Sequence, residues 1–201
     1  MSNFFISSLW PGLLVWSCLY VADYALTITC ARLYRKGVNE KFVFEGSYEI
    51  TPYFQQDIDS LRLVSPRFLA ALLVSGGLLA GSWLISAQTQ PELYELLLGV
   101  MILVQLSIHS RHFRNLFMFR AIIKTGGVTG RIEYSRVLLL RMSSVEALIF
   151  SGLYLLLFAF TQSWFILGGT IGCLSLAAKH RALSRKGSAS ATAAVQSPQG
   201  A

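Results

Sequence analysis

The chain has 201 residues, of which 54% are hydrophobic and only 13% are charged. Soluble globular domains usually carry roughly a quarter charged residues, so this composition argues against an ordinary soluble enzyme or binding domain. A net charge of +7 would suggest nucleic-acid binding in a soluble protein. Here the basic residues flank long apolar blocks, and we therefore expect a membrane protein with no nucleic-acid partner.

Apolar blocks long enough to cross a bilayer recur along the chain. Crossing the hydrocarbon core takes about 20 helical residues. The last apolar block, residues 145–178, is too long for one ordinary helix, and the polar sequence Thr161-Gln162-Ser163 divides it. We therefore predict five spans, at about residues 9–30, 68–87, 92–108, 145–160 and 164–178.

The positions of the basic residues predict the orientation of these spans, because cytosolic loops are enriched in Lys and Arg. With the N-terminus outside and the C-terminus inside, all 17 Lys and Arg residues fall in the inner segments 31–67, 109–144 and 179–201. A four-span arrangement would move the basic residues after position 178 to the outer face. The predicted fold is an all-α integral membrane protein with a bundle of five transmembrane helices, in a cell inner membrane or plasma membrane by default.

The inner segments 31–67 and 109–144 are long enough to form a small cytosolic layer. Residues 42–50 fit one strand or a small hairpin, and Thr51-Pro52 can start a helix after it. Residues 128–142 fit either a strand or the approach to the fourth span.

Helix-start and helix-end signals accompany several of the predicted spans. Ser65-Pro66 predicts the start of the second span, and Thr125-Gly126 predicts the end of a third helix that runs past the membrane. Ser143 and Glu146 have the spacing of a capping box at the start of the fourth. We treat residues 1–186 as one membrane domain and predict that the Ser-, Ala- and Gly-rich residues 187–201 are disordered.

Asp23 lies well inside the first predicted span. A carboxylate at the centre of a membrane helix costs about 2.5 to 3.5 kcal/mol, so such residues usually have a function. Gln105 lies at a matching depth in the third span, and Tyr20 and Thr27 neighbour Asp23 on its own helix. These four residues are the predicted intramembrane polar site, for a proton, a cation or a polar headgroup. The alternative is an acid that only fixes helix packing.

A second polar cluster lies where the third span leaves the membrane, and it comprises His109, Arg111, His112 and Arg114. Basic residues at the inner surface attract phosphate headgroups, so we predict that this cluster binds anionic lipids. Ordinary positive-inside anchoring is the alternative. A metal ion would need ligands beyond the two histidines, and no metal or cofactor is predicted.

Two pairs of glycines, each four residues apart, lie in the second and fifth spans: Gly77 and Gly81, and Gly168 and Gly172. Small residues at this spacing let helices approach closely in lipid. The pairs fit either packing of these two spans within one chain or a seam between copies of the chain.

Three classes of function fit these features. A non-catalytic oligomeric scaffold or subunit of a membrane complex is favoured by the glycine pairs and the scarcity of ionisable residues in the spans. A small-solute or ion transporter or channel would use Asp23 and Gln105. An enzyme acting on lipid headgroups would use His109 and His112 with Asp57 or Asp59. No familiar catalytic motif accompanies these residues, so we assign no catalytic residue. We rank the scaffold first, with the bilayer, anionic headgroups and a second copy or another membrane protein as its partners.

Overall fold

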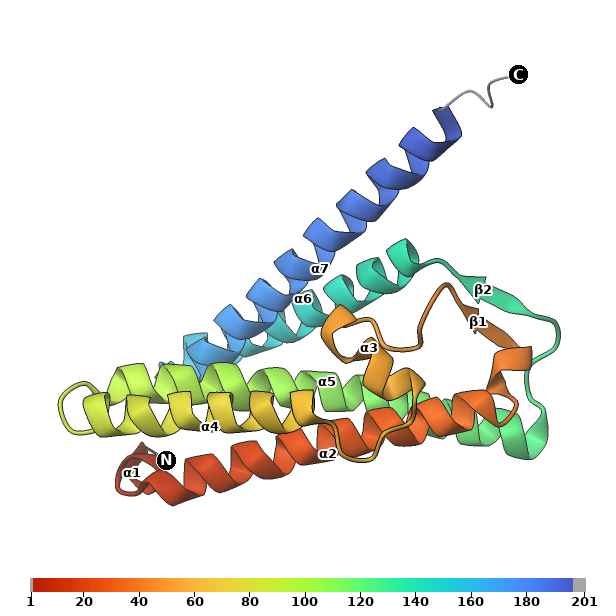
Figure 1. The fold of residues 1–201 in the computed structure, drawn as a ribbon. Helices are drawn as coiled ribbons and strands as arrows, with labels where there is room; N and C mark the ends of the chain where they lie inside the picture. Colours follow the sequence, from red (N-terminus) through yellow and green to blue (C-terminus); the bar gives the residue numbers. More distant parts are fainter. Residues whose placement is uncertain (1, 197–201) are drawn as a thin grey trace.

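The computed structural model describes the backbone of residues 2–196 and the side chains of residues 4–187. Its elements are α1 (Ser2–Ile6), α2 (Leu9–Arg35), the 3-10 helix η1 (Val38–Glu40), β1 (Phe42–Phe44), α3 (Pro52–Asp59), α4 (Pro66–Ser86), α5 (Pro91–Thr125), β2 (Ile132–Tyr134), α6 (Arg136–Thr161) and α7 (Trp164–Gln196) (Figure 1). Among the described residues, α2, α4, α5 and α6 are long and apolar enough to cross a membrane. The all-α class is confirmed, and these four helices indicate a multi-pass membrane protein.

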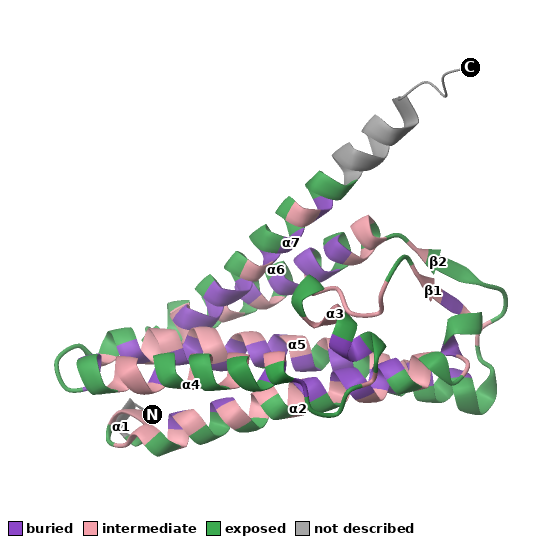
Figure 2. Cartoon of the chain, in the orientation of Figure 1, coloured by how far each residue is buried: buried purple, intermediate pink, exposed green. Residues whose placement is uncertain are grey.

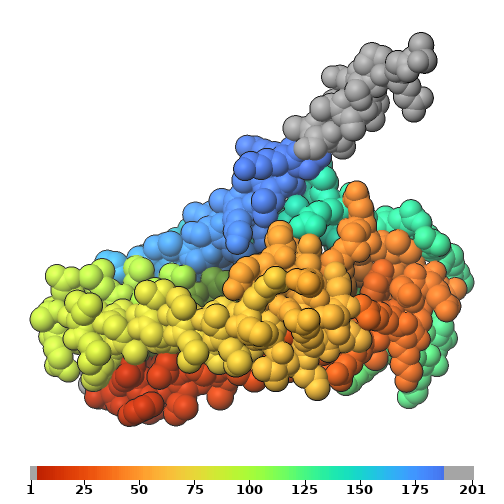
Figure 3. Space-filling model, in the orientation of Figure 1, coloured from red at the N-terminus to blue at the C-terminus, as the bar shows by residue number. Residues whose placement is uncertain are grey.

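The connections between the long helices gather toward two ends of the molecule (Figure 1). One end, which we call the turn end, contains the start of α2, residues 87–90 and the turn at 162–163. The end of α5, the two strands and the start of α6 lie toward the other, which we call the strand end. Figure 3 shows the segment from β1 to α3 (orange) covering the surface near the strand end, beside α4 (yellow).

Several helix boundaries follow the predicted local signals. The Ser65 Oγ caps α4 by accepting hydrogen bonds from the backbone N–H groups of Arg67 and Phe68, at 3.1 and 3.3 Å. The α5 helix continues to Thr125, and Gly126 ends it with a left-handed φ of 62°, a conformation that glycine adopts without strain. The polar break at 161–163 is confirmed, because residues 145–178 belong to two helices separated by two residues.

The start of α6 differs from the prediction. Its N-cap is Ser135, whose Oγ accepts a 3.2 Å hydrogen bond from the Leu138 backbone N–H. Ser143 and Glu146 therefore lie inside a helix, where backbone N–H groups already have partners and need no cap. The predicted capping box is wrong, and both side chains instead bind arginines of α5.

The α7 helix is longer than the predicted span 164–178. It continues to Gln196, and so includes residues 187–196 of the segment predicted to be disordered. The rest of that segment, residues 197–201, lies outside the described residues.

The two strands pair with each other in parallel, in the register Phe42 with Ile132 and Phe44 with Tyr134. The small hairpin considered for residues 42–50 is therefore wrong, and the ambiguous segment 128–142 contains both a strand and the start of α6. Parallel strands require a long crossover connection, and here that connection contains α3, α4 and α5.

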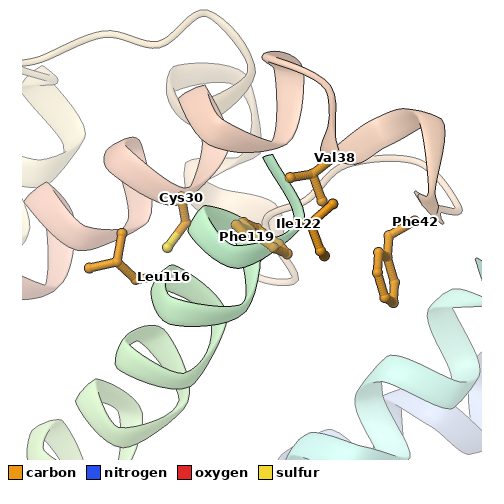
Figure 4. Close-up of a cluster of buried hydrophobic side chains, with 6 residues drawn as sticks. All are labelled: Cys30, Val38, Phe42, Leu116, Phe119 and Ile122. Atoms are coloured by element: carbon orange, nitrogen blue, oxygen red, sulfur yellow. The ribbon is translucent and has the colours of Figure 1, made fainter. Parts of the chain in front are cut away.

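The α5 helix is the centre of the bundle. Buried residues make up 44% of its most apolar stretch and only 11% of the corresponding stretch of α4 (Figure 2). Near the strand end, a cluster of buried side chains joins α2, η1 and β1 to α5 (Figure 4): Cys30, Val38, Phe42, Leu116, Phe119 and Ile122. Nearer the turn end, a second cluster, which we call the turn-end cluster, joins α2, α4 and α5: Trp16, Leu79, Tyr94, Leu98 and Ile102.

The two glycine pairs have different surroundings. A Cβ at Gly168 would collide with the backbone carbonyl oxygen of Leu96, so the absence of a side chain is what lets α7 lie against α5. Gly172 is similarly close to Val104 on α5. A Cβ at Gly77 or Gly81 would meet no atom of the described chain within 4 Å. The α4 and α7 helices therefore do not pair through these glycines.

This difference gives a direct test of the α5–α7 contact. Gly168→Ala should lower the stability by about 1–3 kcal/mol, the usual cost of inserting a methyl group into a filled site. Gly77→Ala is the matched control, and should leave stability unchanged or raise it slightly because alanine favours helix. Thermal unfolding in detergent measures both variants. An equal loss of melting temperature in the two would contradict the close approach of α7 to α5.

Candidate functional site

Asp23 of α2 lies beside His112 of α5, so the two predicted polar clusters meet. The Asp23 Oδ1 is 3.1 Å from the His112 Nε2, within ion-pair distance. The contact does not have the geometry of a hydrogen bond. The Thr27 Oγ is 3.3 Å from the same nitrogen and donates to the Asp23 carbonyl oxygen at 2.9 Å. Because both neighbours offer lone pairs, we assign the ring proton to Nε2.

A cavity of about 200 Å³ opens beside this contact, between α2, α5 and the segment 49–58, and we call it the α2–α5 cavity. Its walls include all four residues of the predicted intramembrane site, Tyr20, Asp23, Thr27 and Gln105. The structure thus brings together side chains that lie on two helices and are far apart in the sequence.

Two buried side chains of this cavity have polar atoms without a partner in the described part of the chain. Gln105 is 7% exposed and its Oε1 accepts no hydrogen bond, while His112 is 6% exposed and its Nδ1 has no partner. Leaving such an atom unsatisfied costs about 1–3 kcal/mol. The Asp23 side chain keeps 24% of its exposure, so small polar molecules can reach it. Together these features are typical of a binding site.

A second cavity, of about 310 Å³, lies between α5, α6 and the strand pair, and we call it the α5–α6 cavity. Arg114, Tyr48 and Met142 are among its lining residues. It shares Arg111 and His112 with the α2–α5 cavity, together with Glu49. These shared side chains form the wall between the two cavities.

The two arginines of the α5 cluster differ in their partners. Arg114 forms an ion pair with Glu146 of α6. The Arg111 Nη1 donates a 2.5 Å hydrogen bond to the Ser143 Oγ, and no carboxylate of the described residues lies within ion-pair distance of it. Arg111 therefore keeps its positive charge available to both cavities, and the walls of the α2–α5 cavity also include the carboxylates of Asp23 and Glu49.

The loop from Glu45 to Thr51 is fixed over these cavities. The Arg136 backbone N–H donates to a Glu45 carboxylate oxygen at 2.8 Å, and the Arg136 guanidinium donates to the Ile50 carbonyl at 3.2 Å. Asn115 donates a 3.4 Å hydrogen bond to the Tyr48 hydroxyl. Burial raises the pKa of Tyr48 well above its usual value of 10.0, so this hydroxyl stays protonated at neutral pH.

His109 stands apart from the other residues of its predicted cluster. Its side chain is buried, its Nδ1 lies 2.7 Å from the Gln105 carbonyl oxygen one turn earlier, and it lines neither cavity. The predicted headgroup site is therefore divided: Arg111, His112 and Arg114 line the α5–α6 cavity, and His109 packs inside the bundle. Among the described residues, no group of three His, Cys, Asp or Glu side chains could hold a metal ion.

The two acids considered for a headgroup enzyme have structural partners. Asp57 is buried, and it accepts hydrogen bonds from the Ser65 Oγ at 2.6 Å and from Arg62 at 3.4 Å. Asp59 is exposed and accepts a 2.7 Å hydrogen bond from the Ser47 Oγ. Neither acid lines a cavity with His112, so the residue set of that hypothesis does not form one site.

Sequence reasoning missed Glu49, the acid that lines both cavities. It lies in an irregular loop, and no motif marks it. Glu146 was interpreted as a cap, although its position inside α6 brings it to Arg114.

Comparison of the chain with protein-family models, curated proteins and solved structures gives no match.

A double-mutant cycle tests the Asp23–His112 contact. We expect Asp23→Ala and His112→Ala to be coupled by about 0.5–3 kcal/mol, the range for side chains in direct contact. Asp23→Ala with His109→Ala is the control, and should be additive within about 0.5 kcal/mol. Both cycles are read from unfolding free energies in detergent. Additivity in the first cycle would rule out an energetic link between the two residues.

Proposed function

We propose that this protein is a small-solute transporter whose binding site is the α2–α5 cavity. The observation that carries the proposal is the convergence of Asp23 and Gln105 on one polar cavity. The carboxylate of Asp23 is partly exposed there, and the Gln105 Oε1 has no partner among the described residues. A site of this kind suits a solute that replaces its hydration shell with protein groups.

The charges around the cavity favour a solute that carries both signs. Asp23 and Glu49 offer carboxylates to an ammonium group, and Arg111 offers a guanidinium to a carboxylate or phosphate group. Opposite charges on one small molecule would satisfy both sides without leaving a buried charge unpaired. The solute class we propose is therefore a small zwitterion.

The proposed topology has five spans, with the N-terminus outside and the strand end in the cytosol of a cell with an inner or plasma membrane. The gathering of the connections at two ends supports it (Figure 1), as does the confinement of all 17 Lys and Arg residues to the inner segments. The fifth span is the apolar part of α7, which buries Cys173 and Ala177. A C-terminal reporter should be active only in the cytosol, and activity outside would overturn the topology.

In this orientation the cavity is closed toward the outside. The turn-end cluster lies between it and the outer ends of α2, α4 and α5, and the Trp16 ring packs on the Tyr20 ring at 5.1 Å between centroids. The wall on the other side comes from the cytosolic segment that contains Glu49 and Thr51. The proposed transport cycle would therefore open the turn-end cluster toward the outside and move the segment that contains Glu49 and Thr51 to open the cavity toward the cytosol.

Solute binding can be tested before the solute is identified. The protein is purified gently, denatured, and the released small molecules are identified by mass spectrometry. We expect a zwitterion from the wild type and at least about tenfold less from Asp23→Asn, because loss of a charge-assisted contact costs about 1.5–3 kcal/mol. Asp59→Asn removes an exposed acid outside the cavity and is the control.

Uptake of the identified molecule into proteoliposomes then separates transport from simple binding. Retention of the same molecule by wild type and Asp23→Asn would contradict a role for Asp23 in the site. Binding without uptake would contradict transport.

The second candidate function is an oligomeric scaffold or a subunit of a membrane complex. The observation that favours it is the open face of α4, where Gly77 and Gly81 meet no other part of the described chain. Close helix packing in lipid uses such glycine pairs, so another copy or another membrane protein could pack there.

Native mass spectrometry tests this second candidate. We expect a defined oligomer or heteromeric complex for the wild type, and dissociation to single chains for Gly77→Leu/Gly81→Leu. A Cβ at either position meets no atom of the described chain within 4 Å, and an unchanged melting temperature of the single chain would show that the leucines leave its own fold intact. A wild type that is already a bare monomer would argue against the scaffold.

A further inference from the structure

A groove of about 400 Å³ lies between α6 and α7, on a part of the molecule separate from both cavities described above. Three arginines line it: Arg141 comes from α6, and Arg181 and Arg185 come from α7. All three are exposed. Val145 and Leu148 add an apolar wall, with exposed fractions of 55% and 40%.

Within the described residues, no acidic side chain neutralises the positive charge of this groove. No Asp or Glu lines the groove, and no ion pair within the described residues includes any of the three arginines. The sequence contains no Asp or Glu after Glu146, so α7 has no carboxylate side chain of its own to pair with these arginines. Three like charges that line one groove repel each other, and a bound anion would relieve that repulsion.

The groove is also preformed. The α6 and α7 helices run side by side (Figure 1), and the Ser144 Oγ donates a 2.9 Å hydrogen bond to the Ala177 carbonyl oxygen beside it. The relative position of the two helices is therefore fixed at this level. Arg114 of the predicted headgroup cluster is a weaker candidate for binding an anion than the three arginines of the groove, because its charge is already paired with Glu146.

The depth of the groove matches the headgroup region of the inner leaflet in the proposed topology. The apolar part of α6 begins at Val145, and that of α7 ends at Ala178. Arg141 and Arg181 therefore lie just beyond the hydrocarbon, where lipid phosphates are, and Leu148 lies within it. Phosphate on the arginines and an acyl chain on the apolar wall would use both parts of the groove.

We propose that the α6–α7 groove binds an anionic phospholipid of the inner leaflet, with its phosphate on Arg141, Arg181 and Arg185. The proposal uses the orientation in the proposed function but not the solute-binding role of Asp23. A failure of solute binding would leave it unaffected.

Native mass spectrometry in the presence of equal amounts of phosphatidylglycerol and phosphatidylcholine tests the proposal. The test variant is Arg141→Gln/Arg181→Gln/Arg185→Gln. The control variant is Lys36→Gln/Lys124→Gln/Arg131→Gln, which removes the same charge at the strand end but outside the groove. We expect the wild type and the control to retain phosphatidylglycerol preferentially. The test variant should lose that preference by about tenfold or more, because each basic residue contributes about 1 kcal/mol near an anionic surface.

An equal loss in the two triple variants would overturn the proposal, because it would show general charge attraction. If the test variant does not fold, Arg181→Gln alone should still reduce the rise in melting temperature that phosphatidylglycerol causes. An unchanged rise in that single variant would count against the site. An equal rise with inorganic phosphate would identify a soluble anion as the ligand, and retention of an acidic protein in place of lipid would identify a protein partner. Either result would overturn the assignment to lipid.

Discussion

The close contact between α5 and α7 determines how the rest of the bundle is arranged. Glycines at 99, 168 and 172 remove the side chains that would otherwise hold the two helices apart. Because α7 occupies this face of α5, α6 packs on α7 and touches α5 only slightly. The α5 and α6 helices diverge toward the strand end (Figure 1). The strand pair and the loop that carries Glu49 fill the opening, and the α5–α6 cavity is the space that remains.

The polar site follows from the cost of placing a carboxylate among membrane helices. An unpaired Asp at the centre of a span is unfavourable by about 2.5 to 3.5 kcal/mol. His112 within 3.1 Å and a partly exposed position beside a polar cavity both reduce that cost for Asp23. The same arrangement leaves acceptor capacity on the Asp23 Oδ1 and the Gln105 Oε1. Both residues line the α2–α5 cavity, and these atoms can accept hydrogen bonds from a molecule that enters it.

Much of the helical framework could be predicted because its signals are local. The length of apolar blocks, the Ser65 cap and the glycine after Thr125 each depend on a few neighbouring residues. Depth matching also placed Gln105 near Asp23, because each helical residue advances by about 1.5 Å along the axis. The parallel strand pair and the Glu146–Arg114 ion pair were not predictable in this way. Both depend on how helices rotate and diverge, and Glu146 fits a cap as well as it fits a partner on another helix.

The parallel pairing of β1 with β2 has a consequence for how the protein is made. The residues that join the strands include α3, α4 and α5, so two long helices must be synthesised before β1 can meet its partner. At typical rates of about 5–20 residues per second, this interval lasts roughly 5–20 seconds. During that time Phe42 and Phe44 have no strand beside them, and the nascent chain exposes an aromatic edge. Completion of the strand pair is therefore a late event in biogenesis, after the synthesis of α4 and α5.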